Sequence, residues 1–287
     1  MTNQPVAHFA DHACHERVTV EENTQIACDT YRLRFRCPEL ARSIVPGQFL
    51  MLRLAGFDDP LLGRPLALYD TVVDDGDAVG IDVVYLVQGK LTTRLARLGK
   101  GAALEVWGPL GNGFEPQPAE HLVMVAGGIG QTPFVALAQE HLGKRHYGNP
   151  PRHVATGLRV TLCYGARSQR YLAGVEDFER LGVEVRTSTD DGTAGHHGLV
   201  TELLQEVLAE SPSCRVVCCG PEKMMERVAE ITLARSVPCQ VSLETQMACG
   251  IGICFSCVAR VRGADGAWDY RRTCVEGPVF DAAQIEW

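Results

Sequence analysis

The N-terminal third of the chain alternates short apolar runs with turn signals. Residues 31–36 alternate apolar and basic side chains, and residues 49–54 and 81–87 are apolar runs rich in strand-forming residues. Glycine-containing turn signals separate runs of this kind, at residues 46–47, 75–76 and 111–113. This pattern predicts an antiparallel sheet, for which closure into a barrel is the natural architecture.

The middle of the chain changes to alternating strands and helices. The apolar runs expected as strands are residues 122–126, 160–164, 183–185 and 216–219. The helical stretches between and after them include residues 134–142, 199–210 and 222–234. Such alternation predicts a Rossmann-like parallel sheet covered by helices, with ligands at the carboxyl ends of its strands. Residues 144–156, which include Pro150-Pro151, are expected to form an exposed loop.

These differences in residue pattern along the chain predict an N-terminal tail and three domains. The tail covers residues 1–15, the β-barrel residues 16–117, the α/β domain residues 118–238, and a small C-terminal domain residues 239–287. Four residues of the tail, His8, His12, Cys14 and His15, suggest a metal site. A polar tail is the simpler interpretation, because no hydrophobic frame surrounds them.

Composition narrows the classes of function. The 287 residues carry a formal charge of −8 without a block of lysine and arginine, which argues against nucleic acid or an anionic membrane as a partner. No signal peptide is apparent, and no apolar run approaches the roughly 20 residues of a membrane helix. Twelve cysteines would suggest a disulfide scaffold only in a short secreted protein. We therefore expect a cytoplasmic protein in a reducing compartment.

Four cysteines near the C-terminus are spaced Cys249-x4-Cys254-x2-Cys257-x16-Cys274. A [2Fe-2S] cluster needs four thiolates on a small surface, three of them from one short turn. Gly250 and Gly252 suit that turn because they permit positive φ. Zinc is the main rival, since Cys254-x2-Cys257 could begin a zinc ribbon, and a disulfide pair is a weaker one. The x4 gap with its glycines favours the iron–sulfur cluster and an electron carrier.

The other eight cysteines, except Cys219, are expected to pack as small apolar residues. Cys219 follows a predicted strand and opens a strand-to-helix turn, Cys219-Gly220-Pro221. Its thiol would stand where a nicotinamide ring meets a flavin, although a buried cysteine at a strand end is the simpler interpretation.

A glycine-rich turn in the same predicted sheet connects residues 122–126 to a helix. Its sequence is Gly127-Gly128-Ile129-Gly130-Gln131-Thr132-Pro133. Glycines allow a close turn, Thr132 can cap the helix, and Pro133 suits its first position, so free amides can face a pyrophosphate. Such a turn alone is more often a plain connection. Together with the turn at Cys219, however, it should open onto one crevice.

These motifs and four further ones occur in an order that resembles the ferredoxin-NADP reductase superfamily. The further motifs are Arg64-Pro65-Leu66-Ala67-Leu68-Tyr69, Gly89-Lys90-Leu91-Thr92, residues 108–114 and residues 164–167. Within that superfamily the chain resembles electron-transfer subunits of class 1B dihydroorotate dehydrogenases, over essentially everything after residue 15. The most specific parts are the cluster loop and residues 189–195 and 198–201.

The resemblance implies FAD in the barrel, NAD(H) in the α/β domain and a [2Fe-2S] cluster on the four cysteines. It places Arg64 on the FAD diphosphate, Leu91 and Thr92 in the phosphate turn, and the remaining flavin contacts at Pro65, Leu66, Ala67, Val84, Tyr85 and Leu86. The family usually has serine or threonine at the position of Ala67 and glycine at that of Leu91. Arg167 and Ser168 could contact an adenosine ribose.

The resemblance also implies a function. Electrons would pass from a partner FMN dihydroorotate dehydrogenase subunit, in a heterotetramer, over the cluster and FAD to NAD, in pyrimidine biosynthesis. The chain would thus be an NAD(P)-linked oxidoreductase subunit without a catalytic acid, base or nucleophile. One alternative is a reductase for an oxygenase or a bifurcating transhydrogenase subunit, although the transhydrogenase family typically has aspartate at one cluster ligand. A redox sensor or a zinc-stabilised binding module is the non-enzyme alternative.

Overall fold

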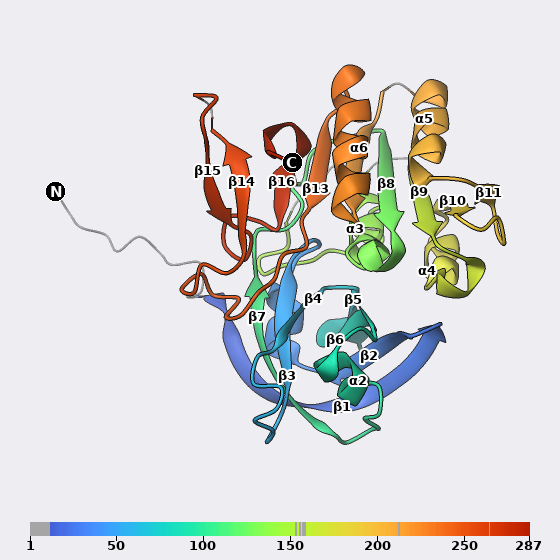
Figure 1. Ribbon diagram of the computed structural model, residues 1–287. Helices are drawn as coiled ribbons and strands as arrows, with labels where there is room; N and C mark the ends of the chain where they lie inside the picture. The colour runs from blue at the N-terminus through green and yellow to red at the C-terminus, as the bar shows by residue number, and fades with distance from the viewer. Residues whose placement is uncertain (1–11, 153, 155, 157–158, 212, 264) are drawn as a thin grey trace.

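The structure is a computed structural model that describes residues 12–152, 154, 156, 159–211, 213–263 and 265–287. An antiparallel sheet occupies the lower part of Figure 1 and a parallel sheet the upper right, and the C-terminal hairpin stands beside the parallel sheet. The predicted fold class is confirmed. His8 of the predicted tail lies outside the described residues. Among the described residues, no helix combines the length and apolarity needed to cross a membrane.

The antiparallel sheet has seven strands in the order β4-β3-β7-β1-β2-β6-β5. Their bounds are β1 (Cys14–Ala27), β2 (Thr30–Arg36), β3 (Phe49–Leu54), β4 (Arg64–Ala67), β5 (Asp70–Asp74), β6 (Asp77–Leu86) and β7 (Ala103–Leu110), with helices α1 (Pro38–Ser43) and α2 (Lys90–Leu95) between them. The edge strands β4 and β5 follow each other in the chain. Between them Leu68 N–H bonds the Gln48 carbonyl and Tyr69 N–H bonds that of Asp82, so these two residues draw the sheet edges together.

The second sheet has the order β11-β10-β9-β8-β12-β13-β16 and is parallel except for its last strand. The strands are β8 (His121–Gly127), β9 (Arg159–Ala166), β10 (Glu184–Thr189), β11 (His196–His197), β12 (Arg215–Cys219), β13 (Cys239–Ser242) and β16 (Val279–Asp281). Strand order reverses between β8 and β12. That switch point is where open α/β sheets bind ligands.

Helices cover both faces of this sheet (Figure 1). One core lies beneath α5 (Val200–Glu210) and α6 (Glu222–Ala234) and contains Leu204, Val216 and Val228. The other lies beneath α3 (Phe134–His141) and α4 (Val175–Arg180) and contains Phe134, Leu162 and Phe178. The central strand β8 is buried along its whole length, as expected for a strand covered on both faces.

Two boundaries differ from those expected. Strand β1 begins at Cys14, inside the stretch expected to be a tail, because Cys14 pairs with Gly108 of β7. The C-terminal segment is joined to the parallel sheet, since it supplies both β13 and β16. Only the part between them departs from the sheet, as the cluster loop and the hairpin of β14 (Val258–Arg262) and β15 (Trp268–Arg272).

Candidate cofactor cleft and metal centre

A cleft of about 1020 Å³ lies between the barrel and the carboxyl ends of β8 and β12. The flavin and nucleotide residues expected from the sequence line it, except Gly127, Gly128, Arg167 and Ser168. Small-molecule pockets commonly span roughly 300–1000 Å³, so the cleft is large enough for an extended cofactor such as a dinucleotide. The motifs that were separate along the chain therefore share one cavity.

The two glycine turns touch at the switch point. A Cβ on Gly130 would lie 2.2 Å from the carbonyl oxygen of Cys219, so only glycine fits there. A Cβ on Gly127 would lie 2.7 Å from Pro221 Cδ. Gly127 thus permits the two turns to pack together, although it does not line the cleft. Gly128 has a φ of +55°, a backbone conformation that favours glycine.

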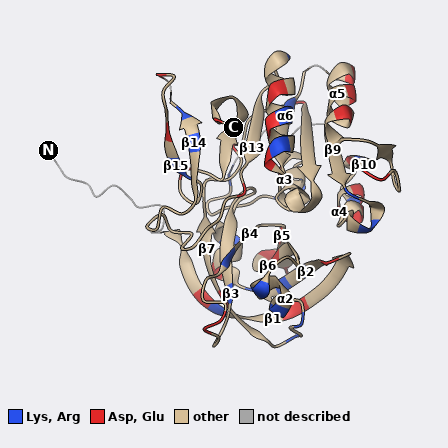
Figure 2. Ribbon diagram, in the orientation of Figure 1, with Lys and Arg blue, Asp and Glu red and all other residues tan. Residues whose placement is uncertain are grey.

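Arg64 lines the barrel side of the cleft with its charge uncompensated by a carboxylate in the described structure. Its Nη1 donates to the carbonyl oxygens of Gly63 at 2.9 Å and Leu62 at 3.3 Å. The basic residues of α2, coloured blue in Figure 2, differ, because Lys90 Nζ and Arg94 Nη2 both contact the carboxylate of Asp59, at 2.6 and 3.0 Å. Arg64 is therefore a cation available to an anionic ligand on the barrel side of the cleft.

The turn at Gly89 is closed by a side chain. Thr92 Oγ1 accepts hydrogen bonds from the amides of Gln88 at 3.0 Å and Gly89 at 3.1 Å. Leu91, which departs from the family pattern, is 1% exposed and packs in the barrel core. Its side chain is therefore accommodated by the barrel core. Tyr85 likewise points into that core and donates to Asn23 Oδ1 at 3.0 Å.

One wall of the cleft does not follow from the sequence pattern. Residues 242–248 and 285–287 line it, together with Ser256 beside the cluster cysteines. This segment reaches the cleft because β13, which ends at Ser242, pairs with β12 beside the Cys219 turn. Burial, together with the nearby carboxylate of Glu244, raises the pKa of the Cys219 thiol to about 12, so this thiol is neutral.

The loop of Arg167 and Ser168, expected near an adenosine ribose, lies beside the loop of residues 189–195 at the same end of the sheet. The amide of Asp191 donates to the carbonyl of Arg167 at 3.3 Å, and the amide of Gln169 donates to Thr193 Oγ1 at 2.9 Å. Arg167 and Asp191 are exposed. Arg167 and Ser168 do not line the cleft itself.

The four cluster cysteines are neighbours, but they do not form one compact group. Cys249 influences the pKa of the Cys254 thiol, and Cys257 and Cys249 both influence that of Cys274. Within the described chain, no three of the four sulfurs lie within 4.8 Å of one another. Four thiols at this wider spacing fit two bridged metal ions, as in a [2Fe-2S] cluster, better than one tetrahedral zinc.

The loop that carries these cysteines is held on the barrel. A Cβ on Gly250, whose φ is +74°, would lie 2.6 Å from Met51 Cγ on β3. Arg272 Nη1 donates to the Gly252 carbonyl at 2.9 Å and fixes the other glycine of the loop. Backbone amides are also aimed at sulfur, since Ile251 N–H donates to Cys249 Sγ at 3.4 Å. Such donors disperse thiolate charge in iron–sulfur sites.

The cysteines of the iron–sulfur loop differ in their exposure to solvent. Cys254 is exposed, and hydrogen bonds from the Ser256 hydroxyl and amide lower the pKa of its thiol to about 6. Cys274 is fully buried, and burial raises the pKa of its thiol to about 12. One edge of the centre thus faces solvent while the other lies in the apolar cluster of Phe49 and Leu110.

Comparison with family models divides the chain into three matches. Residues 17–114 match the oxidoreductase FAD-binding domain, and residues 124–230 match the oxidoreductase NAD-binding domain. Residues 244–286 match the iron–sulfur cluster binding domain of dihydroorotate dehydrogenase B. FAD, NAD and an iron–sulfur cluster are therefore the cofactors of these domains.

Two relatives of similar length have the same protein name. "Dihydroorotate dehydrogenase B (NAD(+)), electron transfer subunit" of Desulforamulus reducens is 35% identical over 263 residues, which cover 91% of this chain and 94% of the relative. The protein of that name from Geobacillus kaustophilus is 36% identical over 274 residues, covering 94% and 98%.

Solved structures agree on the fold. The NADH-dependent reduced ferredoxin-NADP oxidoreductase, solved in connection with flavin-based electron bifurcation, superposes with a TM-score of 0.78 at 27% identity and covers 94% of this chain and 90% of its own. The ferredoxin reductase in carbazole 1,9a-dioxygenase superposes with a TM-score of 0.64 at 20% identity, covering 79% and 67%, which shows the fold alone.

Proposed function

This chain belongs to the family of dihydroorotate dehydrogenase B electron-transfer subunits, and we propose that it passes electrons between a partner FMN dihydroorotate dehydrogenase subunit and NAD, in pyrimidine biosynthesis. We assign residues 16–117 to FAD, residues 118–238 to NAD(H) and residues 239–287 to the [2Fe-2S] cluster. The chain is then an oxidoreductase subunit whose partner carries out the chemistry on dihydroorotate.

One observation carries the proposal: the cluster loop is a wall of the cofactor cleft. Met247, Ala248 and Ser256 line the cleft, and Ala248 and Ser256 directly precede Cys249 and Cys257 of the loop. The barrel residues Pro65 and Ala67 and the turn residue Cys219 line the same cavity. Three cofactors bound to these residues would be adjacent, which electron transfer between them requires.

The residues of this chain position the cofactors and stabilise the charges that they carry. FAD, when bound, supplies two-electron exchange with nicotinamide and one-electron exchange with an iron–sulfur cluster. Arg64 offers a planar guanidinium for the diphosphate. The Gly130 and Gly220 turns bring backbone close to the nucleotide at the switch point. Cys249, Cys254, Cys257 and Cys274 would hold the [2Fe-2S] cluster.

The surface around Cys254 supports a docking partner. Ile253 and Phe255, on either side of this exposed ligand, are 70% and 63% exposed. Large apolar side chains around an exposed metal ligand are typical of an interaction surface. We propose that the FMN subunit docks here, in a heterotetramer of two copies of each chain. A cytoplasmic location is part of the proposal, because all twelve cysteines are free thiols.

The test combines cofactor analysis with a coupled assay. Protein from anaerobic, iron-supplied cells should contain FAD and about two irons and two sulfides per chain, and NADH should bleach its visible absorbance under argon. The complex with the co-expressed FMN subunit should reduce NAD with dihydroorotate, whereas either subunit alone should not.

A colourless preparation would contradict the cofactor assignment. Gel filtration that shows only separate subunits would contradict the partnership. Bleaching by NADH without any dihydroorotate-dependent NAD reduction in the complex would favour the alternative, a reductase of another system.

A further inference from the structure

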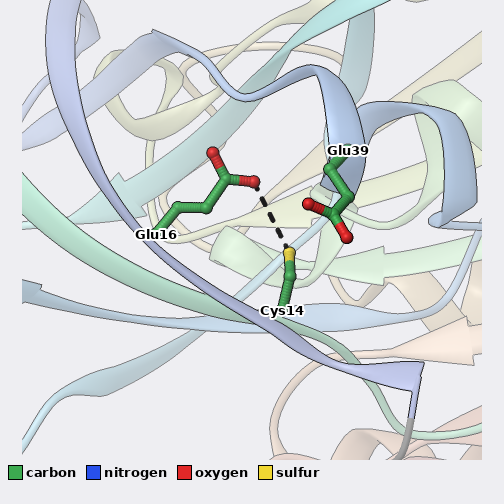
Figure 3. A group of neighbouring side chains, drawn as sticks. All are labelled: Cys14, Glu16 and Glu39. Carbon is green, nitrogen blue, oxygen red and sulfur yellow. Dashed lines mark hydrogen bonds between the residues drawn. The ribbon is translucent and has the colours of Figure 1, made fainter.

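A second group of thiols and carboxylates lies at the start of the barrel, away from the cofactor cleft. Cys14 and Glu16 are two residues apart on β1, so both point to the same face of the strand. Cys37 and Glu39 lie where β2 passes into α1. Figure 3 shows the thiol of Cys14 between the carboxylates of Glu16 and Glu39.

The distances in this group approach those of a metal site. Cys14 Sγ and Cys37 Sγ lie 3.7 and 3.3 Å from the same oxygen, Glu16 Oε1. One ligand atom each from Cys14, Glu16 and Glu39 lie within 4.8 Å of one another. Zinc bonds of about 2.3 Å to sulfur and about 2.0 Å to oxygen give tetrahedral edges of about 3.3–3.8 Å. Cys14, Glu16 and Glu39 are close to that geometry, whereas Cys37, which contacts Glu16 but lies outside this group of three, must move toward the others to complete it.

The charges in the group are uncompensated. In the described part of the chain, neither Glu16 nor Glu39 has an arginine, lysine or histidine within ion-pair distance. Two carboxylates gathered beside a sulfur pair repel one another unless a cation lies between them.

The four residues differ in how far they are buried. Cys37 is fully buried, and Cys14 and Glu16 are partly buried against the barrel core, whereas Glu39 is exposed on α1. A cation could therefore enter past Glu39 and be held against the sulfurs. None of the four residues lines the cofactor cleft or belongs to the iron–sulfur loop.

We propose that Cys14, Glu16, Cys37 and Glu39 form a zinc site that fastens the first residues of β1 to the turn between β2 and α1. Two thiolates favour zinc over magnesium and calcium, which prefer all-oxygen sites. The four protein ligands would complete a tetrahedron, as in structural zinc sites. The ion would link segments about twenty residues apart in a barrel whose N-terminal strand is long and curved.

The experiment measures zinc by mass spectrometry in the full-length protein with its flavin and cluster, after dialysis against buffered zinc. Wild type should retain about one zinc per chain beyond its iron. Glu39→Gln, an exposed change that should fold normally, should weaken zinc binding by more than roughly tenfold. Cys14→Ser should abolish it. Glu22→Gln and Cys28→Ser are the matched controls and should bind zinc as wild type does.

Zinc in the iron–sulfur loop must be distinguished from zinc at this site. In Cys254→Ser, which disrupts the loop, zinc dependent on Cys14 should persist, so this outcome is independent of the electron-transfer function. A wild-type protein without retained zinc, or Glu39→Gln and Cys14→Ser proteins that hold as much zinc as wild type, would overturn the proposal. A Cys14–Cys37 disulfide formed in place of zinc uptake, seen as a mass loss in the intact protein, would also overturn it.

Discussion

Trp107 Nε1 donates a hydrogen bond of 3.0 Å to the carbonyl oxygen of Cys249. Trp107 belongs to β7, which pairs with β1 and β3 in the barrel, and Cys249 is the first cysteine of the iron–sulfur loop. The indole thus connects the sheet that lines the barrel side of the cleft to the first proposed ligand of the cluster. The position of the loop depends on this barrel contact as well as on its own glycines.

Replacing Trp107 with phenylalanine keeps much of the apolar contact but removes this hydrogen bond. We expect the free energy of holding the loop to fall by about 1 kcal/mol, the net value of a typical hydrogen bond. Iron should then be lost to a chelator roughly fivefold faster than from wild type. Absorbance of the cluster over time measures this, and an unchanged rate would show that the bond does not hold the loop.

A substitution of Cys254, the exposed cysteine of the iron–sulfur loop, tests the cluster independently of the flavin. Cys254→Ser should lose the cluster and its EPR signal while keeping FAD, because this side chain lies outside the buried core. NADH oxidation with ferricyanide should remain, whereas dihydroorotate-dependent NAD reduction in the complex should stop. Cys28→Ser is the control. Normal iron content in Cys254→Ser would rule out this residue as a ligand.

Arg64 should contribute charge to FAD binding. Arg64→Ala should weaken FAD affinity about 10- to 100-fold, since hydrogen bonds to charged groups contribute about 1.5–3 kcal/mol. Arg64→Lys should recover only part of the loss, because lysine lacks the planar fork. Titration of flavin fluorescence measures the affinity. Arg36→Ala, an exposed change outside the cleft, is the control, and equal affinities in all four proteins would contradict the role.

Gly130 tests the contact between the two turns. Its substitution by alanine places a methyl group 2.2 Å from the Cys219 carbonyl oxygen and must push the turns apart. We expect the KM for NADH to rise more than about tenfold while FAD and iron contents stay normal. Gly99→Ala, where a Cβ meets nothing within 4 Å, should behave as wild type. An unchanged KM in Gly130→Ala would place the nicotinamide nucleotide elsewhere.

His141 should make stability depend on pH. It is 3% exposed on α3, and burial lowers its pKa to about 4. The unfolded histidine titrates near 6.5, so the unfolded state binds more protons below that pH and the free energy of unfolding falls. The loss should reach about 2 kcal/mol by about pH 5 and be absent above about pH 7.

Denaturant unfolding of wild type and His141→Leu at these two pH values measures the effect. The variant should lose most of the difference and retain a smaller one from His121, whose pKa is also lowered by burial. Equal pH dependence in both proteins would assign the effect to other groups.

Elements with strong periodicity follow from the sequence. Helix α6 covers Glu222–Ala234 and strand β3 covers Phe49–Leu54, the ranges that their apolar patterns predict. Strand β1 does not follow in the same way, since of its fourteen residues only Val18 and Val20 are buried. Its many exposed polar positions leave no apolar run to recognise, and pairing with β2 and β7 makes it a strand.

By itself the sequence determined the iron–sulfur loop and the two glycine turns, because each depends on residues within a few positions of one another. The tertiary structure decided which other segments of the chain these motifs contact. The order of strands places β12 beside β8, and packing on β3 and β7 brings the loop to the cleft. The tertiary structure also brings Cys14 close to Cys37. Contacts between distant segments depend on how the sheet closes, which no local spacing specifies.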